Sequence, residues 1–326
     1  MAALSRIGSG PAPTEIVALA VDPKQWRIGL VGYGEVGRIL AEDLHELGVA
    51  KLIAFDLKLA AGDAPQMRIH AAKHGVKLSD SHRALADDCD LIVSAVTANQ
   101  AVAVAQACAP AVKFGAWFLD LNSASPNAKK RAAGFIDDAG GVYVEGAVMT
   151  SLPPYRIGVP LLLGGTRAAE LRPKLTMLGF DAKVVSRKLG VASATKMCRS
   201  VMIKGLEAMV VESFTAARAY GVEDQVLASL KETFPGIDWE QQGAYFFQRA
   251  IQHGRRRAEE MREVAATVRD IGLTPWSAAG TAERQAWLAD QADAGLFGDK
   301  TSKQFAKNGD WRPEADRILN KFRARG

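Results

Sequence analysis

Residues 25–44 read QWRIGLVGYGEVGRILAEDL, and this stretch decides the fold. The apolar run from Ile28 to Val31 predicts a strand, and the amphipathic segment after Gly37 predicts a helix. Between them stands a GxGxxG sequence, Gly32-Tyr33-Gly34-Glu35-Val36-Gly37. In such a turn the first glycine permits the tight bend, the second lets phosphates approach the backbone, and the third lets the helix pack closely on the strand. The stretch therefore predicts a pyrophosphate site at a helix start, formed by these six residues.

The next apolar run, Lys51 to Phe55, ends in Asp56, which follows Gly37 by 19 residues. A carboxylate at this place can accept hydrogen bonds from ribose hydroxyls and repels a 2′-phosphate, so NAD is favoured over NADP. Lys58 lies close enough to weaken this preference, and NADP remains possible. The alternative is a doubly wound domain whose first turn is merely tight.

The length of 326 residues suggests two domains, and 48% apolar with 24% charged residues is an ordinary globular balance. The formal net charge is +5 and the isoelectric point about 9.1. The one basic run, Arg255 to Arg257, is followed by Glu259 and Glu260, which is typical of a solvated, salt-bridged helix face. We therefore expect no nucleic-acid partner.

Three cysteines, Cys89, Cys108 and Cys198, have no metal-like spacing, and so sparse and odd a number fits a reducing compartment. Cys198 is interpreted as a buried small hydrophobe. No apolar run approaches 18 residues and no leader pattern opens the chain, so a cytoplasmic protein without membrane contact is expected. Residues 1–26 are interpreted as an N-terminal extension.

Strand and helix patterns alternate through about residue 187, which predicts a mostly parallel, doubly wound sheet in a domain of residues 27–189. Strand signals then nearly vanish, and residues 190–326 are expected to form a separate helical domain. Its predicted helices cover 192–220, 223–233, 239–249, 256–271 and 278–294.

Ligands of such sheets bind outside the carboxyl ends of the strands. This rule collects several polar or glycine-rich segments at one edge. They are Gly32 to Gly37, Asp56, Val96-Thr97, Asn122-Ser123 and Glu145 to Ser151. Val96 and Thr97 are accordingly expected to contact the cofactor.

A bound nicotinamide supplies a hydride, so the protein must supply a proton donor or acceptor for the substrate oxygen. Lys196, which opens the first helix after the predicted sheet, is the candidate for this role. Arg199, Ser200 and Lys204 follow three, four and eight residues later and share its helical face. Three basic groups on one stripe would attract a carboxylate, so a small anionic substrate is expected. Mutual repulsion and burial would favour a neutral lysine, as a general base requires. An exposed lysine at a helix start is the alternative, and spacing alone leaves both open.

The five histidines show no paired metal spacing. His70 and His74 stand at i and i+4, but the sequence offers no third ligand beside them. No metal site is therefore expected.

The ordered set of motifs resembles the β-hydroxyacid dehydrogenases, which include 3-hydroxyisobutyrate dehydrogenase and are related to 6-phosphogluconate dehydrogenase. The set comprises GxGxxG, an acidic strand end, a DxN-S-x-S-P turn, a GG-terminated strand and a GxxxxxK helix start, within roughly residues 27–290. The resemblance implies a Rossmann domain, then an all-α domain with one long interdomain helix, and an oligomer, here expected to be a homodimer. It also implies a catalytic lysine at Lys196, a substrate contact at Ser123 and a cofactor contact at Arg262.

The family's D-A-P-V-S-G-G substrate loop is changed here to Glu145-Gly-Ala-Val-Met149-Thr150-Ser151. Met149 has no hydroxyl, and Thr150 crowds the backbone where the family has glycine. Arg199 and Ser200 replace an asparagine pair. The resemblance therefore places Met149, Thr150, Arg199 and Ser200 at the substrate, and these changes suggest a substrate unlike the family's small 3-hydroxy acids.

These observations favour an NAD(P)-dependent oxidoreductase that interconverts a hydroxyl and a carbonyl on a small organic acid or related polar substrate. Ile203 stands where 6-phosphogluconate dehydrogenase has a glutamate, which argues against oxidative decarboxylation. An imine reductase is one alternative, although such enzymes usually carry aspartate or tyrosine at the lysine position. A non-catalytic NAD(P)-binding sensor or scaffold is the other.

Overall fold

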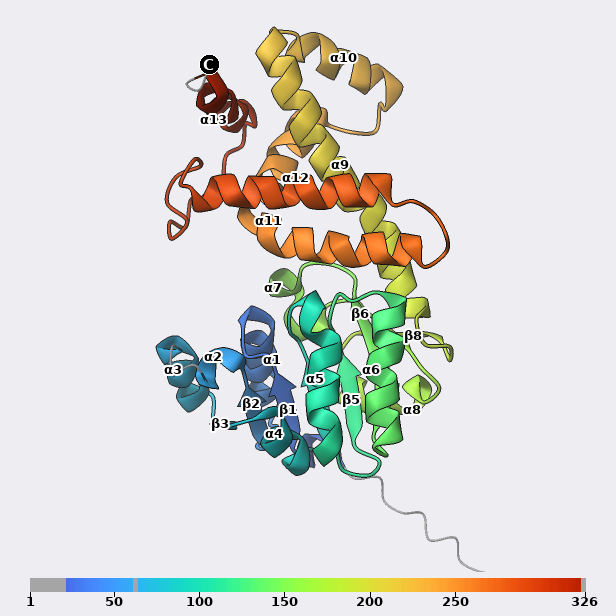
Figure 1. Cartoon of the computed structure of the whole chain (residues 1–326). Coiled ribbons are helices and arrows are strands. Elements are labelled where there is room, and N and C mark those ends of the chain that lie inside the picture. The colour runs from blue at the N-terminus through green and yellow to red at the C-terminus, as the bar shows by residue number, and fades with distance from the viewer. Residues whose placement is uncertain (1–21, 61–63, 324–326) are drawn as a thin grey trace, which may run out of the picture.

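The computed structural model describes residues 22–60 and 64–323, and a single eight-stranded sheet organises the first half of the chain (Figure 1). The strand order is β3-β2-β1-β4-β5-β6-β7-β8. The strands are β1 (Ile28–Val31), β2 (Leu52–Phe55), β3 (Val76–Leu78), β4 (Leu91–Ser94), β5 (Trp117–Asp120), β6 (Val142–Val148), β7 (Leu161–Gly164) and β8 (Ala182–Ser186). All neighbouring strands pair in parallel except β6 and β7.

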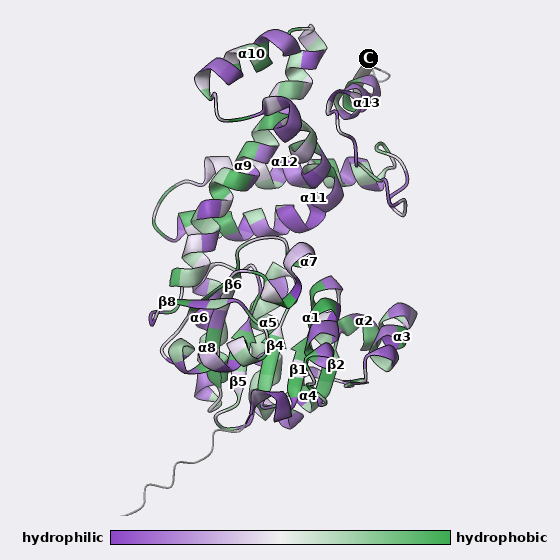
Figure 2. Cartoon of the chain, turned by 180° about the vertical axis from the view of Figure 1, so that it is seen from behind, coloured by the Kyte–Doolittle hydropathy of each residue, from purple (hydrophilic) through white to green (hydrophobic). Residues whose placement is uncertain are grey.

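The central strands are apolar on both sides. Every residue of β1, β2, β4 and β5 is buried, as is typical of a parallel sheet covered on both faces. In β4, Leu91 and Val93 pack into the core on one side of the sheet while Ile92 packs on the other. Figure 2 shows these strands as hydrophobic ribbon and the helices around them in mixed colours. The alternating pattern in the sequence correctly predicts this doubly wound sheet.

Helices cover both faces of the sheet. Leucines of α1 (Glu35–Glu46) and α8 (Ala168–Met177) fill one side of the core. Residues of α4 (His82–Asp88), α5 (Ala101–Cys108) and α6 (Pro126–Asp138) fill the other side. The short helices α2 (Leu57–Ala60), α3 (Pro65–Lys73) and α7 (Leu152–Tyr155) and the 3₁₀ turns η1 (Pro23–Gln25), η2 (Ala98–Gln100), η3 (Ala109–Ala111) and η4 (Arg156–Gly158) complete this part.

The second half of the described chain is helical. It comprises α9 (Val191–Tyr220), α10 (Glu223–Thr233), α11 (Trp239–Arg269), α12 (Trp276–Asp293) and α13 (Arg312–Arg323). Helix α9 runs from the sheet into the helical part, where α11 and α12 pack against it (Figure 1). The sequence-based expectation of a Rossmann domain followed by an all-α region with a long interdomain helix is thus confirmed.

The predicted break in the middle of α11 is wrong. The sequence suggests two helices, 239–249 and 256–271, whereas one continuous helix spans Trp239–Arg269. Gly254 lies inside it, and a Cβ there would press against the Gln285 carbonyl oxygen of α12 at 2.6 Å. This glycine therefore permits close helix packing and does not end the helix.

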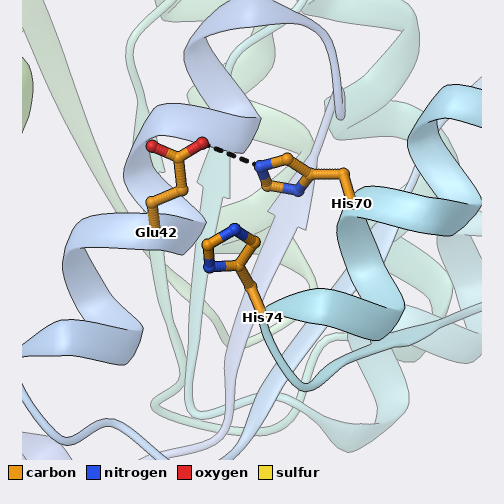
Figure 3. A group of neighbouring side chains, drawn as sticks. All are labelled: Glu42, His70 and His74. Carbon is orange, nitrogen blue, oxygen red and sulfur yellow. Dashed lines mark hydrogen bonds and ion pairs between the residues drawn. The ribbon is translucent and has the colours of Figure 1, made fainter.

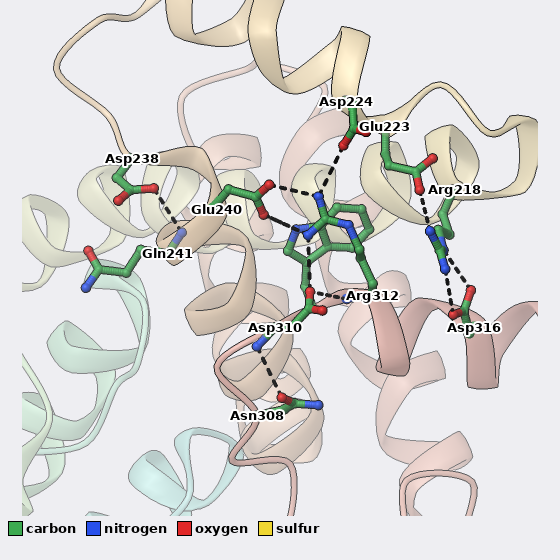
Figure 4. Close-up of polar contacts among 11 residues, drawn as sticks. Arg218, Glu223, Asp224, Asp238, Glu240, Gln241, Asn308, Asp310, Arg312 and Asp316 are labelled. Carbon is green, nitrogen blue, oxygen red and sulfur yellow. Dashed lines mark hydrogen bonds and ion pairs between the residues drawn. The ribbon is translucent and has the colours of Figure 1, made fainter.

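The C-terminal segment packs into the helical core. Trp311 is 1% exposed, and its ring lies 4.9 Å from that of Phe214. Ion pairs fasten the start of α13 from outside, with Arg312 Nη2 2.8 Å from Glu240 Oε1 and Arg218 Nε 2.9 Å from Asp316 Oδ1 (Figure 4). Because these pairs are partly solvated, the buried aromatic contacts supply most of the stabilisation.

Two further expectations concern the chain as a whole. The proposed N-terminal extension, residues 1–26, lies outside the described residues except for its last five, 22–26. Across residues 22–60 and 64–323, none of the helices combines the length and apolar character that a membrane crossing requires.

Candidate active site

The glycine loop joins β1 to α1 at the carboxyl edge of the sheet. Gly32 has a φ of +90°, and a Cβ at Gly37 would collide with the Gly32 carbonyl oxygen. A Cβ at Gly34, by contrast, would meet nothing within 4 Å, and no side chain caps the start of α1. The loop therefore presents free backbone N–H donors toward an open space. This geometry fits the pyrophosphate of a dinucleotide.

Asp56 follows β2 and lies beside that loop. Its Oδ2 accepts a hydrogen bond from the Tyr33 N–H at 2.9 Å, and its Oδ1 accepts one from the Lys58 N–H at 2.9 Å. Each carboxylate oxygen can accept a second bond, so the side chain can still receive ribose hydroxyls. Lys58 itself is exposed. Two backbone donors therefore fix the orientation of the Asp56 carboxylate beside the glycine loop.

Asn122 fixes the loops after β4 and β5. Its Oδ1 accepts the Val96 N–H at 2.6 Å, and its Nδ2 donates to Ser94 Oγ at 2.9 Å. Thr97 is exposed and donates to Asn99 Oδ1 at 2.7 Å. The predicted cofactor contacts Val96 and Thr97 thus lie at the same sheet edge as Asn122.

A buried polar cluster under Asn122 holds the loop rigid. Asp120 Oδ1 accepts the Asn122 N–H at 2.8 Å and pairs with Lys129 Nζ at 2.8 Å, while Asp120 Oδ2 accepts Tyr143 O–H at 2.6 Å. Asp120 and Lys129 are 0% and 1% exposed. Sequence reasoning missed Lys129, although a lysine among the apolar positions Ala128, Ala132 and Ile136 of α6 is a usable signal.

Lys196 and Ser123 meet where α9 leaves the sheet. The Lys196 Nζ donates to Ser123 Oγ at 2.7 Å. Burial, opposed by the negative charge of Glu260, lowers the pKa of Lys196 to about 7. A lysine with this pKa can both accept and donate a proton near neutral pH.

Glu145, at the end of the parallel part of β6, holds the start of α9. Its Oε1 accepts the N–H groups of Gly190 at 2.8 Å and Ala192 at 3.1 Å, and its Oε2 accepts the Ser193 hydroxyl at 2.8 Å. A buried carboxylate at a helix N-terminus satisfies the free N–H groups and the helix dipole together. Glu145 therefore positions the first turns of the helix that carries Lys196.

The expected stripe of three cations on α9 is only partly correct. Lys204 and Ser200 are buried on the side of Lys196, and Lys204 Nζ donates to Ser200 Oγ at 3.3 Å. Arg199 instead is exposed and reaches the Met149 carbonyl oxygen at 3.4 Å. Cys198 is also exposed, so its interpretation as a buried residue is wrong. Arg199 and Cys198 lie on the solvent side because this part of α9 buries only the face that carries Met197, Ser200 and Lys204.

Helix α11 closes the site from the helical part. Glu260 Oε2 lies 2.8 Å from Lys204 Nζ, and Glu263 Oε2 accepts the Ser125 N–H at 2.7 Å. The neighbouring Arg262 is exposed. The expectation that Arg255 to Arg257 and Glu260 share a solvated helix face is therefore wrong for Arg257 and Glu260, which are only 6% and 8% exposed. The buried residues Met261 and Val264 beside Glu260 are the signal that could have indicated this.

The altered substrate loop follows β6. Met149 is half-buried, and its N–H donates to the Pro160 carbonyl at 3.0 Å. Thr150 is exposed at the turn into α7. The contact between Met149 and Arg199 brings this loop to the exposed side of α9, next to the Lys196 turn.

Comparisons with known proteins agree with the fold and with a dinucleotide-binding domain. Residues 27–185 match the NAD binding domain of 6-phosphogluconate dehydrogenase, and residues 217–288 match a domain of unknown function, DUF1932. A conserved hypothetical protein from Sinorhizobium meliloti 1021 is 35% identical, with a TM-score of 0.70 over 90% of this chain and 95% of that one.

Two proteins named as 3-hydroxyisobutyrate dehydrogenases are less similar in sequence. The 3-hydroxyisobutyrate dehydrogenase of Mycobacterium tuberculosis, solved with L-serine, is 17% identical, with a TM-score of 0.65 over 82% of this chain and 96% of that one, which shows a shared fold. The mitochondrial 3-hydroxyisobutyrate dehydrogenase of Drosophila melanogaster is 24% identical over 230 residues, 69% of either chain.

Proposed function

The chain belongs to the 3-hydroxyisobutyrate dehydrogenase-like β-hydroxyacid dehydrogenase family, and from this premise we propose that it interconverts a hydroxyl and a carbonyl on a small organic acid. Its NAD(P)-binding domain supplies the cofactor site. The observation that carries the proposal is the 2.7 Å contact between Lys196 Nζ and Ser123 Oγ at the carboxyl edge of the sheet. A homodimer in the cytoplasm remains our prediction.

Lys196 moves the proton. When bound, the nicotinamide accepts or supplies the hydride. In the oxidative direction the neutral Lys196 amine takes the proton of the substrate hydroxyl, and in the reductive direction its ammonium form donates a proton to the carbonyl oxygen. The pKa of about 7 makes both forms available. Ser123 orients the amine through its hydroxyl.

The remaining candidate residues select the substrate and the cofactor. Arg199, exposed beside Met149, can bind an anionic group of the substrate with two parallel hydrogen bonds. Ser200 and Thr150 offer further hydroxyls, while Met149 offers an apolar contact. Asp56 disfavours a 2′-phosphate, so we propose that NAD is used in preference to NADP.

The test is Lys196→Ala, with Lys188→Ala as the matched control because Lys188 is an exposed lysine shortly before the same helix. A panel of hydroxy acids, semialdehydes and imines is assayed with NAD and NADP. We expect kcat of Lys196→Ala to fall by about 10²- to 10⁴-fold while the dissociation constant for NADH stays within about twofold. A kcat near that of the wild type would refute the role of Lys196.

A second candidate function is a non-catalytic NAD(P)-binding sensor. The change from the family's serine to Met149 in the substrate loop favours it, since an anchor for the substrate is lost. Tight NADH binding without turnover across the panel would support this candidate. Turnover of imines alone would instead support an imine reductase.

A further inference from the structure

A cluster of imidazole and carboxylate groups lies between α1 and α3, on the part of the sheet remote from α9 and α11 (Figure 1). Glu42 of α1 faces His70 of α3 and His74, the residue directly after α3 (Figure 3). The candidate ligand atoms of these three side chains all lie within 4.8 Å of one another, and all three residues are half-buried. The proposed redox reaction uses none of them.

The two helices present these groups as matched pairs. His70 and His74 are four residues apart on one face of α3, and their rings stack with centroids 4.5 Å apart. On α1, His45 follows Glu42 by one turn, and its ring lies edge-on to that of His74 at 6.1 Å. One helix thus offers a carboxylate and an imidazole, and the other offers two imidazoles.

We propose that Glu42, His70 and His74 bind a divalent transition-metal ion of the zinc type, with His45 as the fourth ligand. Imidazole nitrogens and a carboxylate oxygen are ligands that zinc takes at about 2.0–2.2 Å in tetrahedral sites. Because the three groups already converge on one point from two helices, side-chain rotation alone closes the site. Magnesium prefers an all-oxygen shell and fits this mixture poorly.

The hydrogen bonds of the cluster define how the ion enters. His70 Nε2 and Glu42 Oε1 are 2.9 Å apart, and an ion between them takes the place of this hydrogen bond. Arg156 Nη2 donates to the other oxygen of Glu42 at 2.6 Å, and this bond can persist. This bond orients the Glu42 carboxylate, as hydrogen bonds to the ligands do in other metal sites. The positive charge of Arg156 lowers the affinity of the site for a cation.

The site is connected to the glycine loop. Tyr33 Oη lies 2.9 Å from His70 Nδ1, and the Tyr33 N–H donates to Asp56. An ion on Nε2 leaves the proton of His70 on Nδ1, where it can be donated only to Tyr33. The bound ion would therefore clamp α3 to α1 and hold Tyr33, a residue of the glycine loop, in one hydrogen-bonding state.

The experiment uses the full chain carrying Cys198→Ser, so that this exposed thiol does not compete for zinc. Zinc chloride is titrated into chelator-treated protein by calorimetry, with magnesium chloride as a comparison. We expect one zinc ion per chain and a higher thermal midpoint with zinc but not with magnesium. His74→Ala should weaken zinc binding by at least about tenfold.

His74 is the preferred variant because its side chain makes no hydrogen bond within residues 22–60 and 64–323, whereas His70 bonds to both Glu42 and Tyr33. The metal-free thermal midpoint of His74→Ala should therefore fall only slightly, by the loss of its ring contacts with His70 and His45. His82→Asn serves as the control, since His82 packs against Phe55 outside the cluster. Absence of zinc binding, or equal affinity in the parent and in His74→Ala, would overturn the proposal.

Discussion

Lys204 Nζ lies 2.8 Å from Glu260 Oε2, and this buried ion pair joins α9 to α11 two helical turns beyond Lys196. Glu260 also accepts a hydrogen bond from Arg256 Nη1 at 2.7 Å. Burial lowers the pKa of Lys196 most, the charge of Glu260 raises it, and the charge of Lys204 lowers it again. The pair therefore adjusts the protonation of Lys196 without touching it.

Replacing Glu260 should change both the pKa of Lys196 and the stability of the fold. Glu260→Gln removes the charge that raises the pKa of Lys196, so the pKa should fall below its value of about 7. Lys204 would remain buried without a carboxylate, which should cost about 3 kcal/mol of folding free energy. The pH profile of oxidative kcat/KM and urea unfolding measure the two effects. Glu259→Gln, next in the chain, is the control, and an unmoved pH profile would contradict the electrostatic role of Glu260.

The wild-type protein should show opposite pH dependences in the two directions. With a Lys196 pKa of about 7, oxidation should speed up as pH rises through 7 and then level off, because the neutral amine is the base. Reduction should slow down above about pH 7, because the ammonium form is the acid. Rates of both reactions, measured between about pH 5.5 and pH 9 with saturating cofactor, show in which direction each rate changes with pH. The same slope in both directions would show that another group moves the proton.

Asp56→Asn should relax the choice of cofactor. The amide oxygen can still accept the Tyr33 N–H of the glycine loop, while the charge and the hydrogen bond from the Lys58 N–H are lost. We expect the KM for NADP to fall by about tenfold, which corresponds to about 1.4 kcal/mol, and the KM for NAD to rise less. Asp22→Asn, on the exposed turn before β1, is the control. An unchanged ratio of the two KM values would mean that Asp56 does not face the ribose.

Lys129→Met should destabilise the fold strongly. It leaves the fully buried Asp120 carboxylate without its cation, a change that typically costs about 3–5 kcal/mol. Lys130→Met, its exposed neighbour on α6, should change the free energy of unfolding by less than about 0.5 kcal/mol. Urea unfolding of both variants and of the wild type measures these changes in the free energy of unfolding. Equal stabilities would mean that the Lys129–Asp120 pair does not stabilise the fold.

Much of the fold could be predicted from local patterns. The glycine triad and the apolar strands need only neighbouring residues to be recognised, which is why the doubly wound sheet was predicted correctly. The break in α11 was predicted wrongly. Gly254 does not end the helix but leaves room for the Gln285 backbone of α12, and this contact cannot be read from neighbouring residues. Cys198 was misplaced because its exposure depends on which side of α9 meets α11 and the sheet.

The amino-acid sequence by itself determined the order of the elements, the glycine loop, the acidic residue after β2 and the lysine at the start of α9, since each is a short-range pattern. Only the tertiary structure decided that Lys196 meets Ser123, that Glu260 pairs with Lys204 and that Glu42 faces His70. These partners lie 73, 56 and 28 residues apart in the chain. Contacts at such separations form because helices and strands pack in three dimensions, and no periodicity along the chain encodes them.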